Sequence, residues 1–201
     1  MGDTTQAGEC ATEEALRRMA RPSPALLKTI RIIDSFSEWS GKTVAWMILP
    51  LFLGLTYEGV ARYLFDAPTL WAYDLSYMLY GALFMLGAHY ALLRGAHIRT
   101  DMLWEKFSPQ VKGRIDTVAY IVFFFPAMIL LFYASVDEAW HSWQMGELSE
   151  QTAWRPALWP FKAVVPLTAL LLLIQGFSEL LKSMYAARTG EFLTTTETIQ
   201  I

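Results

Sequence analysis

The sequence predicts an all-α integral membrane protein with four transmembrane helices and an N-terminal amphipathic interfacial helix. Hydrophobic residues make up 54% of the chain and charged residues only 17%, against about 45–50% and about 25% in soluble domains. Four apolar stretches each come close to the roughly 20 residues that an α-helix needs to cross a bilayer. They cover about residues 44–65, 70–93, 115–136 and 157–181.

Tryptophan is the second indicator of a membrane protein. The chain has 8 tryptophans, and most lie near the ends of the apolar stretches, where amphipathic rings prefer the membrane–water interface. These interface aromatics are Trp46, Trp71, Trp140, Trp143 and Trp159. They support the same four spans that hydropathy predicts.

The predicted domain organisation is simple because four spans leave no room for a separate soluble domain in about 200 residues. Residues 1–22 form a polar tail, and residues 23–41 form the amphipathic helix. Residues 42–185 form the membrane domain, and residues 186–201 form a second tail.

The amphipathic helix is predicted from its start signal and its periodicity. Ser23 is suited to an N-cap and Pro24 to the first helical position. Apolar residues recur at helical spacing, and charged residues are expected to face elsewhere. The apolar set is Leu26, Ile30, Ile33 and Phe36, and the charged set is Lys28, Arg31, Asp34 and Glu38. We expect this helix to lie in the cytoplasmic interface, with its basic residues towards anionic headgroups.

Lysine and arginine outside the spans predict the orientation. Six lie before or at the start of the first span and five in the second connection, against one in the first connection and two in the third. Because cytoplasmic segments carry the excess of positive charge, both termini are predicted to be cytoplasmic. The expected location is the bacterial inner membrane.

Ionisable groups within the spans are the first candidate functional residues, since an unpaired charge in the membrane is costly. Glu58 and Arg62 are four residues apart, a favourable order for an ion pair on one helix face. Asp74 is predicted near the same periplasmic level, so we expect it to join Arg62 in a structural cluster. His89 is expected to be a hydrogen-bonded interhelical residue.

The segment LLRGAHIRTDML at residues 92–103 is the second candidate site. Arg94, His97, Arg99 and Asp101 bring both signs of charge to the cytoplasmic edge of the second span. Arginines at this edge are suited to binding lipid phosphate groups. The four residues together are suited to form a docking surface for a protein partner. His97 and Asp101 alone are too few for a metal site, and we expect neither metal nor cofactor in this chain.

The spans carry no convincing internal repeat and no polar cluster at mid-depth, both of which are usual in secondary transporters. Pro126 and Pro166 are expected to kink the third and fourth helices. These features favour an accessory or scaffolding membrane subunit over an independent carrier.

Two sequence segments resemble a known family. Residues 61–71 read ARYLFDAPTLW, and residues 95–101 read GAHIRTD after the second span. Together with Trp159-Pro160, Lys162, Pro166 and Gln175-Gly176, they are similar to the small membrane subunit, of DctQ type, of tripartite ATP-independent periplasmic (TRAP) transporters. The resemblance covers roughly residues 30–185. Where that family often has two adjacent acids, this chain has Tyr73 and Asp74.

The resemblance implies a role in transport rather than catalysis. Such small subunits assemble with a large, DctM-type membrane subunit that holds the sodium and substrate sites, and a periplasmic binding protein delivers an organic anion, commonly a carboxylate. The small subunit would be the stator of this symporter. Membrane lipids are the other expected contact, and nucleic acid is not a partner. The connection at residues 137–154 could cover the outer edge of a partner.

Two other classes of function stay open. A compact proton-coupled exporter would use Glu58 as its membrane carboxylate, although the neighbouring Arg62 would hold the proton off. A quinone- or haem-binding anchor subunit would need a second histidine at matching depth, and none is expected there.

Overall fold

The computed structural model describes residues 22–95, 108–190 and 193, and every named element within them is a helix. In chain order the elements are α2 (Pro24–Ala45), α3 (Ile48–Leu64), α4 (Ala72–Leu93), α6 (Pro109–Ala119), the π-helix η1 (Tyr120–Phe124), α7 (Phe125–Met145) and α8 (Trp159–Thr189). In this part of the chain, four helical stretches are long and apolar enough to cross a membrane. The predicted fold class is confirmed.

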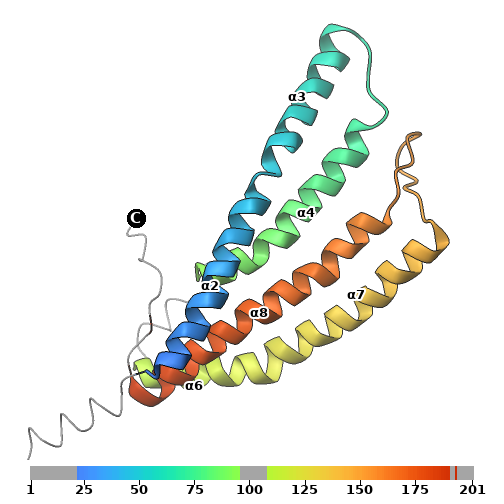
Figure 1. The fold of residues 1–201 in the computed structure, drawn as a ribbon. Helices are drawn as coiled ribbons and strands as arrows, with labels where there is room; N and C mark the ends of the chain where they lie inside the picture. The colour runs from blue at the N-terminus through green and yellow to red at the C-terminus, as the bar shows by residue number, and fades with distance from the viewer. Residues whose placement is uncertain (1–21, 96–107, 191–192, 194–201) are drawn as a thin grey trace, which may run out of the picture.

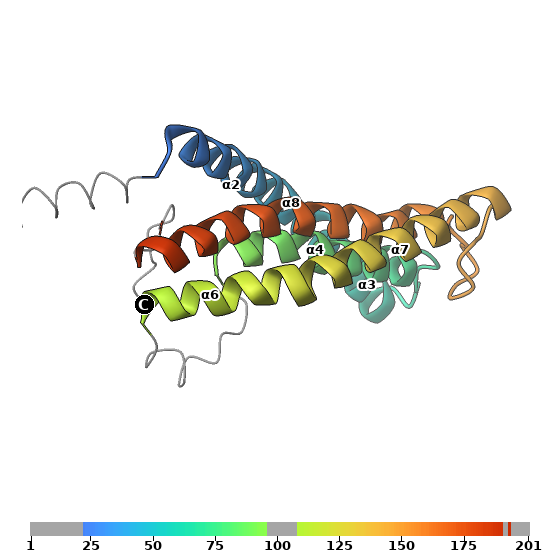
Figure 2. The ribbon, with the colours of Figure 1, turned by 90° about the horizontal axis from the view of Figure 1, so that it is seen from below.

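The helices form two antiparallel pairs, α3 with α4 and α7 with α8 (Figure 1). The pairs lie close together at the end where α2 and α6 begin, and they diverge towards the connections at residues 65–71 and 146–158 (Figure 1). Seen from below, α2 lies on one side of α8 and α6 on the other (Figure 2). Helix α8 also packs against α4 and α7 and is therefore the central element.

The first span is a long helical stretch with a short irregularity. Helix α2 begins where predicted: Ser23 Oγ accepts a hydrogen bond from the backbone N–H of Leu26 (3.2 Å), and Pro24 takes the first helical position. Helix α3 continues almost along the axis of α2 after a break at residues 46–47 (Figure 1). Whether α2 lies in the membrane interface stays a prediction.

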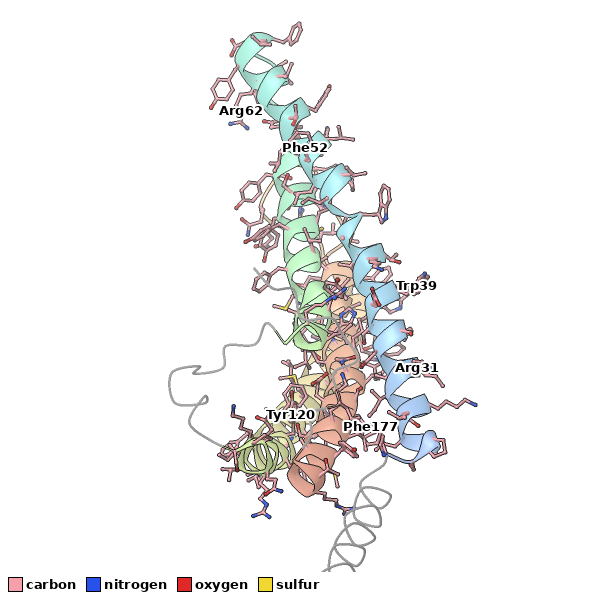
Figure 3. The ribbon with its side chains drawn as sticks, turned by 90° about the vertical axis from the view of Figure 1, so that its left-hand side faces the viewer. Arg31, Trp39, Phe52, Arg62, Tyr120 and Phe177 are labelled. Carbon is pink, nitrogen blue, oxygen red and sulfur yellow. The ribbon has the colours of Figure 1, made fainter. Side chains whose placement is uncertain are left out.

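The face of α2 that packs on the other helices differs from the predicted one. Ile30 is buried, as its place in the apolar pattern indicates. Asp34 was expected to face away from the body, and that expectation is wrong, because its side chain is buried against α8. Arg31 and Trp39 lie on the outer side of α2 (Figure 3).

The third span bends at a π-helical turn (Figure 1). Its first helix, α6, begins at Pro109 directly after the N-cap residue Ser108. The turn immediately precedes Pro126, which has no backbone N–H to donate and crowds the preceding turn. The backbone N–H of Phe125 bonds instead to the carbonyl of Tyr120, five residues back. Pro166, by contrast, lies inside α8, which runs on without interruption.

Small residues let the central helices approach closely, as is usual in membrane bundles. Gly113 of α6 faces the α8 backbone: a Cβ placed there would lie 2.4 Å from the nitrogen of Ala187 and 2.7 Å from the carbonyl oxygen of Ser183. The buried hydrophobic core is likewise rich in alanine, including Ala72, Ala82, Ala169 and Ala186. Close approach of the helix backbones, rather than burial of large apolar side chains, therefore determines how the central helices pack.

The outer faces of α3 and α7 are apolar. Helix α3 has no buried residue at all. Leu53 of α3 and Leu130 of α7 are 64% and 70% exposed. Surfaces of this kind suit lipid tails or another membrane helix rather than water.

Replacing Gly113 with Ala should destabilise the protein by about 1–3 kcal/mol, because the new methyl group meets backbone atoms that cannot move aside. Gly87→Ala in α4 is the matched control, since a Cβ at Gly87 has no atom within 4 Å. Thermal unfolding of both purified variants in detergent measures the difference. Equal midpoints for the two variants would contradict the close α6–α8 crossing.

Candidate assembly site

Glu58 and Arg62 form the ion pair that their spacing predicts. The guanidinium of Arg62 donates to Glu58 Oε1 from Nε (2.9 Å) and from a terminal nitrogen (2.5 Å). The other carboxylate oxygen accepts hydrogen bonds from the backbone N–H (2.9 Å) and the hydroxyl of Thr69. Glu58 thus fastens the end of α3 to the connection at residues 65–71.

Asp74 does not join this pair, contrary to the sequence prediction. Its side chain is fully buried at the start of α4, and Ser149 Oγ donates to its Oδ1 (2.6 Å). The hydroxyl of Thr152 donates to its Oδ2. We call Asp74, Ser149 and Thr152 the Asp74 clasp. It holds the connection between α7 and α8 against α4 and so joins the two helix pairs at the end where they diverge (Figure 1).

The connection at residues 146–158 is held by backbone hydrogen bonds and by ion pairs with Lys162. The N–H of Ser149 bonds to the carbonyl of Pro156 (2.8 Å), and the N–H of Leu158 bonds to that of Glu147 (2.9 Å). Lys162 of α8 donates to Glu138 and to Glu147, each at 2.6 Å. The hydrogen bond from the Lys162 ammonium lowers the pKa of Glu147 below its ordinary value. The carboxylate therefore stays ionised and paired.

The most extensive buried polar network was not predicted. Asp34 of α2 contacts three side chains of α8, Gln175, Ser178 and Lys182. Glu179 of α8 joins them through Gln175 and Lys182, and we call these five residues the Asp34 cluster. Ser178 Oγ and Gln175 Nε2 donate to Asp34 Oδ1 at 2.8 Å and 3.2 Å. Lys182 Nζ lies 2.8 Å from both Asp34 Oδ2 and Glu179 Oε1.

Charge in the Asp34 cluster is compensated in part, because one ammonium lies between two carboxylates. Lys182 and Glu179 have side chains only 13% and 14% exposed. Charges removed from water need such partners to persist. The signal available in the sequence was the helical spacing of the four α8 residues, but nothing in it indicated that Asp34 would face them.

His89 is the interhelical residue that the sequence predicts. It is fully buried in α4. Its Nε2 lies 2.7 Å from Ser40 Oγ of α2, and its Nδ1 lies 2.5 Å from the carbonyl oxygen of Leu86. Because both ring nitrogens have partners, the imidazole fastens α4 to α2 and has no nitrogen left for an iron ligand.

Arg94 is the only residue of the predicted cytoplasmic docking set that lies within the described part of the chain. Its Nε donates to the hydroxyl of Tyr90 (3.0 Å), and a terminal nitrogen lies 3.5 Å from Glu38 Oε1 of α2. It therefore joins α4 to α2. His97, Arg99 and Asp101 lie outside the described residues.

The predicted interface tryptophans all lie in the described part of the chain. Trp46, Trp140 and Trp143 have exposed side chains. Trp143 and Trp159 meet edge to face with ring centroids 4.5 Å apart, and Trp71 stacks on Tyr57 at 5.9 Å. Their position relative to a bilayer stays a prediction.

Taken together, these residues can join helices, and they offer little for chemistry. Among residues 22–95, 108–190 and 193, no group of three or more metal-ligating side chains comes together. The Asp34 cluster, the Asp74 clasp and the His89–Ser40 contact each connect elements distant in sequence. The fold and these contacts define a four-span membrane protein whose polar groups fasten its own helices.

The chain belongs to the family described as tripartite ATP-independent periplasmic transporters, DctQ component, whose model matches residues 51–185. The predicted resemblance is thereby confirmed, with a match that begins later than residue 30. A search of curated proteins gave no match. The chain is therefore a membrane-spanning component of a TRAP transporter, a family of transport proteins rather than enzymes.

Replacing Lys182 with Met should destabilise the protein by about 3–5 kcal/mol, because it leaves the Asp34 and Glu179 carboxylates buried without their cation. Lys42→Met is the control, since Lys42 forms an exposed pair with Glu38 on α2, worth at most about 1 kcal/mol. Denaturation in detergent followed by tryptophan fluorescence gives both values. Similar losses for the two variants would argue against a structural role for the Asp34 cluster.

Replacing Asp74 with Ala should release the connection at residues 146–158, because the Ser149 and Thr152 hydroxyls lose their acceptor. Backbone amides such as those of Ser149 and Leu158 should then exchange their hydrogens faster, while those of α8 stay protected. Hydrogen-exchange mass spectrometry measures this, with exposed Glu150→Ala in the same connection as control. Unchanged exchange in the Asp74 variant would refute the clasp.

Proposed function

We propose that this chain is the stator of a sodium-coupled TRAP transporter of the bacterial inner membrane. The transporter would import an organic anion, specifically a carboxylate. A large DctM-type subunit would carry the sodium and substrate sites, and a periplasmic binding protein would deliver the solute. Both termini of this chain would lie in the cytoplasm. The proposal begins from the family to which the chain belongs.

The observation that carries the stator role is the use of the buried polar groups. Asp34, Asp74 and His89 each hold together elements of this same chain. A carrier needs polar groups that a solute or ion can reach in alternating states. Groups engaged with one another favour a fixed scaffold around which a partner moves.

The contacts of two residues argue against the alternative functions, the proton-coupled exporter and the haem anchor. Glu58 would have to exchange protons in an exporter, but both of its oxygens are engaged by Arg62 and Thr69. A haem anchor would need a free histidine nitrogen, and both nitrogens of His89 have partners. These contacts fit structural roles.

The connection at residues 146–158 supports a periplasmic role within the same proposal. The Asp74 clasp and the Lys162 pairs hold it in one conformation. It presents exposed Glu150 and Trp154 on the side opposite to the predicted cytoplasmic end. A pre-shaped surface loses little entropy when a partner such as the binding protein docks.

Reconstitution tests the proposal. This chain alone in liposomes with an inward sodium gradient should take up no labelled carboxylate. Addition of the large subunit and the binding protein should give sodium-dependent uptake of one organic anion. Control liposomes hold the large subunit and binding protein without this chain, and they should transport less. Uptake by this chain alone, or full uptake without it, would overturn the stator role.

A further inference from the structure

Helix α4 carries a row of exposed aromatic side chains along one face. They are Tyr73, Tyr77, Tyr80 and Phe84, which we call the aromatic stripe. Their spacing of four, three and four residues places them on one side of the helix. Tyr73, Tyr80 and Phe84 are 61%, 63% and 71% exposed, although the opposite face of α4 is buried against α2, α3 and α8.

The tyrosine hydroxyls of the stripe lack hydrogen-bond partners among the described residues. Within the described part of the chain, those of Tyr73, Tyr77 and Tyr80 have no hydrogen bond. Tyr77 contacts Phe161 of α8 only through its ring, with centroids 5.1 Å apart. In water such hydroxyls would be hydrated, but α4 is long and apolar enough to span the membrane, where lipid tails offer no acceptor.

Anchoring at the membrane interface accounts for only part of the stripe. Tyr73 lies at the start of α4, where an aromatic belt is expected. Tyr80 lies seven residues further along, which is roughly 10 Å deeper at about 1.5 Å per residue. A row of hydroxyls that reaches this depth is suited to a neighbour that supplies hydrogen-bond acceptors.

The outer face of α7 shows what a lipid-facing surface of this chain looks like. Its exposed side chains include Ile129, Leu130, Leu131 and Val136, and the single exposed tyrosine there is Tyr133. A row of three tyrosines and a phenylalanine on α4 therefore contrasts with residues 129–136 of α7, whose large exposed side chains are aliphatic apart from Tyr133. The α7 face suits hydrocarbon, and the α4 face suits a neighbour with hydrogen-bond acceptors.

We propose that the aromatic stripe on α4 is the surface that binds the large membrane subunit of the transporter, through helices that offer acceptors to the tyrosine hydroxyls within the membrane. This inference rests on the proposed function, because it takes the large subunit as the partner. Large exposed rings would supply contact area, since aromatic residues are enriched at protein interfaces. The hydroxyls would fix the depth at which the two subunits meet.

The first test removes hydroxyls and keeps the rings. In titrations of the full-length chain with the purified large subunit in detergent, the double variant Tyr73→Phe, Tyr80→Phe should bind more weakly, by about threefold for each hydroxyl. Tyr133→Phe is the matched control, because it removes the same group from the α7 face, and it should bind like the unchanged chain. Undiminished binding of the double variant, or an equal loss in the control, would overturn the proposal.

The second test locates the partner directly. A photoreactive phenylalanine analogue replaces Tyr80 in one variant and Leu130 of α7 in another, each in the assembled transporter in membranes. Cross-linking to the large subunit from position 80 and not from position 130 supports the inference. Cross-links from position 130 alone overturn it while the proposed function stands, and cross-links from position 80 only to lipid or to a second copy of this chain also overturn it. Failure of the unchanged chain to co-purify with the large subunit would overturn both proposals.

Discussion

The buried ion pair between Asp34 and Lys182 is the constraint on which the arrangement of the other helices depends. Burying Asp34 is tolerable only while α2 stays against α8, because separation would leave its carboxylate without a cation in a medium of low dielectric, while Lys182 would keep Glu179 as its partner. Once α2 is fixed, the contact between His89 and Ser40 places α4 beside it. Helix α8 is then held from one side by α2 and from the other by α6, whose Gly113 allows backbone contact.

The same interior explains why the helix pairs can diverge at their other end. Backbone contact is closest between α6 and α8. Towards the opposite end, where the helix pairs diverge (Figure 1), α4 is joined to the other pair by contact of Tyr77 with Phe161 and by the Asp74 clasp. The shape therefore combines a rigid base with an ordered rim, as a scaffold for a larger partner would need.

Sequence signals that act over short distances along the chain predicted the helices and the contacts within them. Hydropathy gave the four spans, Ser23 and Pro24 gave the start of α2, and a spacing of four residues gave the Glu58–Arg62 pair, because each depends on neighbours within one helix turn or one helix. Contacts between distant segments were not predictable in this way. Asp74 pairs with residues 75 and 78 positions away, and Asp34 with residues more than 140 positions away. For Asp74 the sequence identified a costly charge but not the segment that would compensate it, and for Asp34 it predicted an outward-facing residue.

The central claim is that this chain is a rigid scaffold within a moving transporter. Double electron–electron resonance between spin labels at the exposed positions of Tyr63 on α3 and Met145 on α7, with native Cys10 replaced, tests it most directly. In the assembled transporter, with and without sodium, solute and binding protein, the account predicts one narrow distance distribution that does not change. A distribution that shifts or splits when sodium and solute are added would show that the two helix pairs move during transport, and it would contradict the stator role.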